Sequence, residues 1–279
     1  MGNYYYLMAS LPDISLEDAK EAKSVASFKD ELDETLSDKD KKLLFLFYLK
    51  YDCLNLVARL ENPNAEINGL GNYSSEQLQD LITSAKEMNF NVHRYPSFLS
   101  IFAREYSYNK DKEGYFPKDA IIYEYYKYMM TCPNRMVADW ASMNLDINNI
   151  LTALIARKNG WNVGDYIQGD NVVCEMLRNN NAKDFGLSYE YEYITDLMKI
   201  VDCEDPVEKE KRIDALKWIW LEERTFMDIF SIESVFAYIC KLELLERWDK
   251  LDVENGRDTF RQIIENLRSE ARVPDEYKK

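Results

Sequence analysis

Carboxylates are the most numerous side chains in this chain that could take part in chemistry. Its 279 residues include 50 aspartates and glutamates but a single histidine, His93. Closely spaced carboxylates can bind a divalent metal or share a proton. The pairs of this kind include Glu222-Glu223, Asp33-Glu34 and Asp202/Asp205. In a chain of net charge −15 such pairs are usually solvated faces of helices, so we expect a structural role, with carboxylate chemistry left open.

Other catalytic and cofactor-binding patterns are missing from the sequence. It contains no G-x-x-x-x-G-K-[ST], no G-x-G-x-x-G, no C-x-x-C and no H-E-x-x-H. A serine or cysteine nucleophile needs a base, and His93 is the only imidazole. The cysteines are dispersed, which is typical of reduced thiols in a reducing compartment: Cys53, Cys132, Cys174, Cys203 and Cys240. We therefore expect no catalytic activity, no cofactor and no structural metal.

The composition predicts an all-α fold. Only nine glycines and seven prolines are present, and long stretches contain neither. After the capping pair Ser37-Asp38, apolar residues recur every three or four positions at Leu44, Phe47, Tyr48, Tyr51, Leu54 and Ala58, which predicts one buried stripe on a long helix. Further helices are expected over 74–86, 98–106, 136–158, 205–226, 231–248 and 257–271, and another begins at Pro117.

An internal repeat divides the chain. Asp52 and Asn55 recur as Asp146 and Asn149, 94 residues on (146 − 52), and a degenerate copy, Glu243 and Glu246, follows 97 residues later (243 − 146). Each copy is followed by a helix stop, at Asn62-Pro63, Asn159-Gly160 and Asn255-Gly256. The repeat predicts three similar helical lobes, over 1–114, 115–200 and 201–279, within one continuous domain.

The six repeated polar residues have two interpretations. If the lobes surround an axis, Asp52, Asn55, Asp146, Asn149, Glu243 and Glu246 ring a polar mouth that contacts a partner protein. Alternatively, they are buried and satisfied helix–helix contacts. The sequence leaves both open.

Charge and aromatic content bear on the partners. The net charge of −15 argues against binding to nucleic acid. No signal peptide and no membrane-spanning stretch is visible, so we expect a cytoplasmic protein that reaches a membrane only through a protein partner. Of the twenty tyrosines, ten cluster at 4–6, 123–128 and 189–193, where they either pack lobe against lobe or form a protein interface.

Several windows resemble a known family. The stretch from Asp146 to Gly160, D-I-N-N-I-L-T-A-L-I-A-R-K-N-G, resembles the D-x-x-N-Φ-x-T-x-Φ-R-x-K…G helix of the central-stalk C (or d) subunit of V/A-type rotary ATPases. Residues 232–250 resemble the acidic helix of that family's third lobe. The start, Tyr4 to Leu11, is similar to its Y-x-Y-Φ-x-A-R-Φ opening. It is more similar to a bacterial family that begins N-Y-Y-Y-L-x-A-S-L-P and whose genes accompany V-type ATPase genes.

The chain departs from the stalk family at a few positions. Ser10 stands where the family has arginine, Ile155 occupies another arginine position, and Trp248 replaces a small polar or aliphatic residue. Such differences are typical of a divergent branch whose binding surfaces have changed with its partners.

The resemblance implies a function without chemistry. It implies an all-helical funnel of three lobes that sits on the membrane rotor ring, at the inner membrane, and grips the foot of the central shaft. Such a subunit transmits torque for proton or sodium transport. Two alternatives remain: a helical scaffold unrelated to ATPases, which predicts no threefold relation, and an all-α enzyme with a divalent metal, which predicts acidic clusters converging in one pocket.

Overall fold

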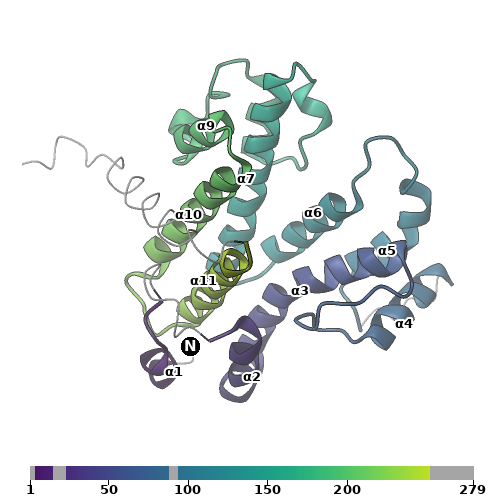
Figure 1. Cartoon of the computed structure of the whole chain (residues 1–279), viewed down its shortest axis with the longest axis vertical. Coiled ribbons are helices and arrows are strands. Elements are labelled where there is room, and N and C mark those ends of the chain that lie inside the picture. The colour runs from purple at the N-terminus through teal and green to yellow at the C-terminus, as the bar shows by residue number, and fades with distance from the viewer. Residues whose placement is uncertain (1–3, 15–22, 88–93, 252–279) are drawn as a thin grey trace, which may run out of the picture. The chain divides into compact units, whose positions relative to one another are not determined.

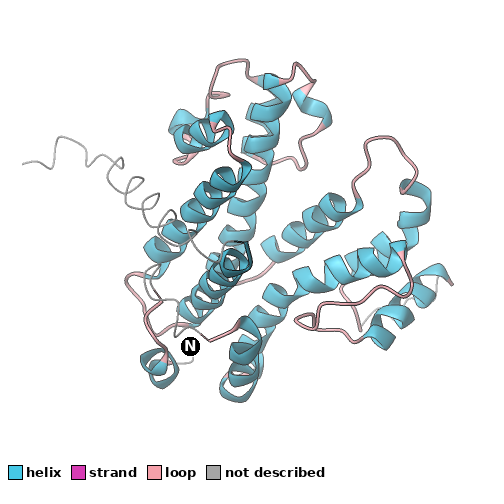
Figure 2. Ribbon diagram, in the orientation of Figure 1, coloured by secondary structure: helices cyan, strands magenta, loops and turns pink. Residues whose placement is uncertain are grey.

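The computed structural model describes residues 4–14, 23–87 and 94–251. Within these ranges the chain forms helices joined by loops and contains no strand, which confirms the predicted all-α class (Figures 1 and 2). The α-helices are α1 (Tyr5–Ser10), α2 (Val25–Thr35), α3 (Asp38–Glu61), α4 (Ser75–Lys86), α5 (Ser97–Asn109), α6 (Pro117–Met130), α7 (Arg135–Lys158), α8 (Val172–Asn179), α9 (Ile194–Asp202), α10 (Pro206–Thr225) and α11 (Ile232–Leu251). Two short 3-10 helices are η2 (Val163–Asp165) and η3 (Leu187–Tyr189).

The chain forms two compact units. One comprises residues 36–145, and the other joins residues 1–35 to residues 146–279, so that the boundary falls inside α7. A division into compact units does not test for a repeat, and the three lobes at 1–114, 115–200 and 201–279 stay a prediction. Of the helices in the described ranges, none combines the length and the apolar character that crossing a membrane requires.

In the unit 36–145, α3 is buried on more than one side. It packs against α4, α5 and α6. Leu44, Phe47 and Tyr48 are buried, as the predicted stripe requires, but Leu54 is 39% exposed. Leu49 and Leu56, outside the stripe, are fully buried. A single stripe was therefore the wrong interpretation, because three neighbouring helices cover α3. The predicted cap is confirmed, since the Ser37 side chain accepts the Asp40 N–H.

In the other unit, α10 packs against α9 and α11, and α2 packs against α11. The sequence analysis missed α2, although its apolar residues Val25, Phe28 and Leu32 are spaced by three and four and are fully buried. The Phe28 ring meets the Tyr238 ring of α11 edge to face, 5.2 Å between centroids. Helix α10 begins where predicted, with Asp205 accepting the Val207 N–H.

Two of the three predicted helix stops are confirmed. Helix α3 ends at Glu61 before Asn62-Pro63. Helix α7 ends at Lys158, and Gly160 takes the left-handed conformation, with φ of +72°, that glycine adopts without strain. The third stop, Asn255-Gly256, the helix predicted over 257–271 and His93 lie outside the described residues.

Candidate functional site

The first Asp-x-x-Asn pair binds the loop that leads into α4. The buried Asp52 carboxylate accepts three N–H groups: Tyr73 N–H at 3.0 Å on Oδ1, and Asn72 N–H at 3.0 Å and Asn72 Nδ2 at 2.7 Å on Oδ2. Asn55 exchanges two hydrogen bonds with the Asn68 backbone, accepting its N–H at 2.8 Å and donating to its carbonyl at 3.0 Å. Two side chains of α3 thereby hold the loop between α3 and α4.

The second pair binds the loop that leads into α8. Asn149 accepts the Gln168 N–H at 3.0 Å and donates to the Gln168 carbonyl at 2.8 Å. Asp146 Oδ1 accepts a hydrogen bond from Asn171 Nδ2 at 2.7 Å. The other end of the Asn171 amide caps α8, because its Oδ1 accepts the Cys174 N–H at 2.9 Å.

The two pairs make the same kind of contact, and we call them the clamps. In each, an asparagine amide matches both polar groups of one backbone residue, since an amide supplies a donor and an acceptor together. In each, the aspartate that precedes the clamp asparagine by three residues accepts a hydrogen bond from the side chain of a loop asparagine. This loop asparagine, Asn72 or Asn171, follows the backbone residue bound by the amide by four or three positions. The sequence repeat between Asp52/Asn55 and Asp146/Asn149 therefore has a counterpart in hydrogen bonding.

The third copy makes a related contact with fewer hydrogen bonds. Glu246 occupies the position of Asn55 and Asn149, and its Oε1 accepts the N–H of Val25 at 2.6 Å. Val25 is the first residue of α2. This side chain therefore also binds the start of a helix, but it has one hydrogen bond and no amide, and its target comes from the N-terminal part of the chain.

The repeated residues are mostly buried. Asp52, Asn55, Asp146 and Asn149 are all at most 7% exposed, and their polar atoms bind within the chain. Glu243 and Glu246 are half-buried. The burial of the first four residues corresponds to the second interpretation left open above, but the clamp hydrogen bonds described above run from a helix to a loop and not from helix to helix. Contact of the six residues with a partner stays a prediction, and the burial of four of them points away from it.

Two of the acidic pairs named from the sequence, Glu222-Glu223 and Asp202/Asp205, bind other groups of the chain, and the third pair, Asp33-Glu34, is exposed on α2. Glu222 accepts the Trp218 Nε1–H at 2.9 Å, and Glu223 accepts the Tyr193 hydroxyl at 3.3 Å. Burial, and then the neighbouring Glu192, raises the pKa of Glu223. Asp202 lies 3.7 Å from the Lys158 ammonium group. Among the described residues, no three or more histidine, cysteine or acidic side chains gather to hold a metal.

A buried carboxylate that the sequence did not indicate joins α10 to α11. Asp214 is fully buried; its Oδ2 accepts the Trp248 Nε1–H at 3.1 Å and lies 3.4 Å from Arg247 Nη1. Burial raises the pKa of Asp214, whereas Lys217 and Arg247 lower it. No local pattern marks Asp214 among 50 acidic residues, since its hydrogen-bond partners, Arg247 and Trp248, lie more than thirty positions away.

Comparison with known proteins assigns a family. The model of a family described as "protein of unknown function (DUF2764)" matches residues 1–271. The chain belongs to this family. The match includes both clamps and the Glu243/Glu246 position. No curated protein and no solved structure matches the chain, so its function must be argued from its own residues.

The tyrosine clusters of this family member divide between core and surface. Tyr4 is buried while Tyr6 is exposed, and Tyr125 is buried with its hydroxyl donating to the Leu46 carbonyl at 3.0 Å. Tyr189 is 99% exposed, whereas burial raises the pKa of Tyr191. The clusters at 4–6 and 189–193 therefore each leave an exposed ring, whereas the tyrosines of 123–128 are buried or half-buried.

The thiols should fall into two reactivity classes. Cys53, Cys174 and Cys240 are buried, and burial raises the pKa of Cys53 and Cys174, which lowers the fraction of reactive thiolate. Cys132 and Cys203 are partly exposed. We expect a disulfide reagent to modify Cys132 and Cys203 rapidly in the native protein, and all the cysteines in denaturant. Peptide mapping after a short exposure checks this, and fast labelling of Cys53 would contradict it.

Proposed function

We propose that this protein is a non-catalytic central-stalk subunit of a V/A-type rotary ATPase, which couples the rotor shaft to the membrane rotor ring during proton or sodium transport. In this role it is cytoplasmic and peripheral to the inner membrane, and it reaches the membrane only through the ring. It binds no nucleic acid and needs no cofactor.

The observation that carries the proposal is the pair of clamps. The same aspartate and asparagine, three residues apart on a long helix, bind the loop before the next helix in two places 94 residues apart in the chain. Glu246, at the third position, binds the start of α2. A molecule built from similar helical lobes is what the resemblance to the central-stalk subunit implies, and the clamps support such a repeat.

The two alternatives predict different features. An unrelated helical scaffold has no reason to repeat one hydrogen-bonding arrangement at corresponding positions. A carboxylate enzyme needs acidic side chains that converge, whereas Glu222, Glu223 and Asp202 each bind a different partner. Both features favour the stalk over its rivals.

Co-purification tests the proposed function. We expect the full chain, produced together with the shaft and ring subunits encoded in the same genome, to elute with them from a tag on the ring subunit. Because the chain carries a net charge of −15, the association should weaken as ionic strength rises. An untagged ring preparation is the control. Elution of the folded chain separately from both subunits at low ionic strength would refute the proposal.

A further inference from the structure

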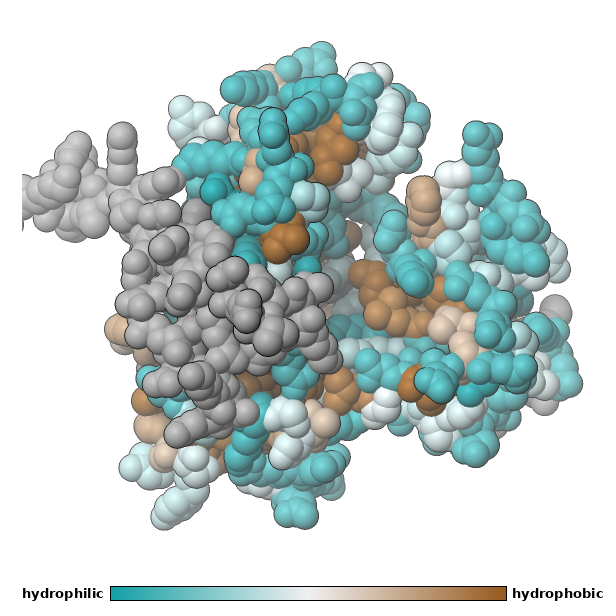
Figure 3. Space-filling view, in the orientation of Figure 1, coloured by the Kyte–Doolittle hydropathy of each residue, from teal (hydrophilic) through white to brown (hydrophobic). Residues whose placement is uncertain are grey.

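Exposed apolar side chains gather where α1 meets the turn between α10 and α11. Tyr6 of α1 is 88% exposed, and on the turn Phe226, Met227 and Ile229 are 77%, 89% and 54% exposed. Figure 3 shows brown, apolar atoms of this region at the lower left of the molecule. We call Tyr6, Phe226, Met227 and Ile229 the turn surface. Exposed apolar side chains in a group, unlike scattered ones, commonly mark an interaction site.

The turn surface is held in place by contacts beneath it. The Tyr4 N–H donates to the Phe230 carbonyl at 3.0 Å, and the rings of Tyr5 and Phe230 lie 4.7 Å apart. The Ser234 hydroxyl donates to the Asp228 carbonyl at 2.6 Å, which closes the turn onto α11. The apolar side chains are therefore presented by an ordered backbone, so that a partner would have little chain to order on binding.

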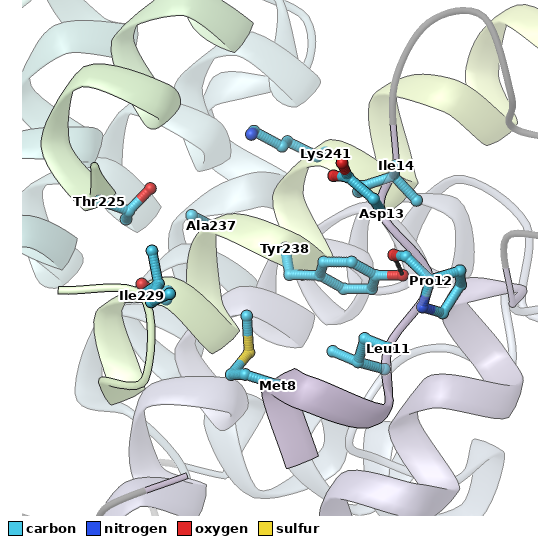
Figure 4. Close-up of a pocket in the computed structure, with 11 residues that line it drawn as sticks. Met8, Leu11, Pro12, Asp13, Ile14, Thr225, Ile229, Ala237, Tyr238 and Lys241 are labelled. Carbon is cyan, nitrogen blue, oxygen red and sulfur yellow. Dashed lines mark hydrogen bonds between the residues drawn. The ribbon is translucent and has the colours of Figure 1, made fainter. Parts of the chain in front are cut away.

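A cavity of about 330 Å³ opens beside the turn surface. Its apolar wall includes Met8, Leu11, Ile229 and Ala237, and Ile229 belongs to both the cavity and the surface (Figure 4). The volume is at the lower end of the roughly 300–1,000 Å³ of small-molecule pockets, which suits one or two large side chains. The cavity therefore continues the turn surface inward.

The Tyr238 and Thr225 hydroxyls of the cavity wall are already hydrogen-bonded within the chain. The Tyr238 hydroxyl donates to the Pro12 carbonyl at 3.1 Å, as the dashed line in Figure 4 shows, and burial raises the pKa of Tyr238 to about 12. The Thr225 hydroxyl donates to the Leu221 carbonyl at 2.8 Å. A polar ligand would find few open hydrogen-bonding groups here, so the cavity favours an apolar side chain.

The charged side chains at the cavity and on the turn differ in whether another group of the chain compensates them. Lys241 lies 3.6 Å from the Glu222 carboxylate and 4.9 Å from the Trp218 ring, so its charge is already compensated. Asp13 lines the same cavity and makes no hydrogen bond or ion pair with the residues that the structure describes. Asp228 is exposed on the turn. The open charges beside the apolar side chains are therefore negative.

We propose that the turn surface and its cavity bind an amphipathic, basic segment of a partner protein. One large apolar side chain enters the cavity next to Ile229, and lysine or arginine side chains approach Asp13 and Asp228. A second copy of this chain is disfavoured, because both copies would carry a net charge of −15. The proposal goes beyond the stalk function and does not depend on it.

Two synthetic peptides test this proposal against the full chain. Both form a helix with the same leucine face, one flanked by lysines and the other by glutamates, and each carries a fluorophore for anisotropy. We expect the lysine peptide to bind, and the glutamate peptide to bind at least about tenfold more weakly. Ile229→Glu should weaken lysine-peptide binding by about tenfold or more, because it places a charge at the mouth of the cavity. Ile229 is already half exposed, so the variant should fold.

A control variant and a vesicle-binding assay complete the experiment. Ile101→Glu introduces the same charge at a 43% exposed isoleucine of α5, in the other unit, and should leave binding unchanged. Equal binding of both peptides, or equal losses for Ile229→Glu and Ile101→Glu, would overturn the proposal. A third outcome would also overturn the proposal: neither peptide binds, the chain co-sediments with lipid vesicles, and Ile229→Glu abolishes that co-sedimentation. The turn surface would then bind a membrane. Circular dichroism confirms that each variant is folded.

Discussion

Replacing Gly71 with alanine should destabilise the unit 36–145 by about 2–4 kcal/mol. A Cβ at this position would lie 2.5 Å from Oδ1 of Asp52 and 3.0 Å from Nδ2 of Asn55. The first distance is too short for real atoms, so the loop or the carboxylate must move. The carboxylate holds three N–H donors in a buried site, and moving it breaks hydrogen bonds that no solvent can replace.

Gly69→Ala is the matched control for this prediction. Gly69 lies in the same loop, and an added Cβ would meet nothing within 4 Å. Both variants replace a glycine with alanine, so they lower the conformational entropy of the unfolded chain by the same amount. We expect urea unfolding to place Gly69→Ala within about 1 kcal/mol of wild type. Equal unfolding free energies for the two variants would mean that the first clamp is not packed as described.

Local sequence signals predicted most of the long helices because their ends are encoded by nearby residues. Ser37 begins α3 and Asp205-Pro206 begins α10, and each cap acts within three positions. The shorter helices α1, α8 and α9 were missed. Helix α8 has only eight residues, and its asparagine cap, Asn171, stands in a stretch that the sequence shows as a polar connection. Tertiary packing stabilises such a short helix, and packing is not visible in a local pattern.

The repeat located the clamp residues, but the sequence could not identify what they bind. The partners of Asp52 and Asn55 lie 13 to 21 positions ahead, and those of Asp146 and Asn149 lie 19 to 25 positions ahead. The two loops differ in length and share no motif. The amide of each asparagine binds the backbone of one loop residue, and every residue type except proline presents the same backbone groups, so no sequence motif indicates this contact. Asn149 also donates to Cys174 Sγ, at 3.4 Å. Burial was therefore only one of two open interpretations.

Replacing either clamp asparagine with aspartate should destabilise the protein by about 3 kcal/mol. In Asn149→Asp, a carboxylate oxygen takes the place of Nδ2, which now donates to the Gln168 carbonyl at 2.8 Å. Two acceptors then face each other in a buried site, and the new carboxylate adds a second negative charge three residues from the buried Asp146. Asn55→Asp replaces the same donor to the Asn68 carbonyl, so the repeat predicts a similar loss in the other unit.

Asn148→Asp is the control, because Asn148 precedes Asn149 on α7 and is exposed. It adds the same charge to the same turn of helix and should change the unfolding free energy by no more than about 0.5 kcal/mol. Binding assays with the same variants bear on the partner interpretation. If Asn149→Asp keeps the wild-type unfolding free energy and loses only the co-elution with rotor subunits, the residue contacts the partner directly. A loss of stability with co-elution intact under folded conditions makes the clamp a structural element of its lobe, since the amide then acts only on groups within the chain, the Gln168 backbone and the Cys174 thiol.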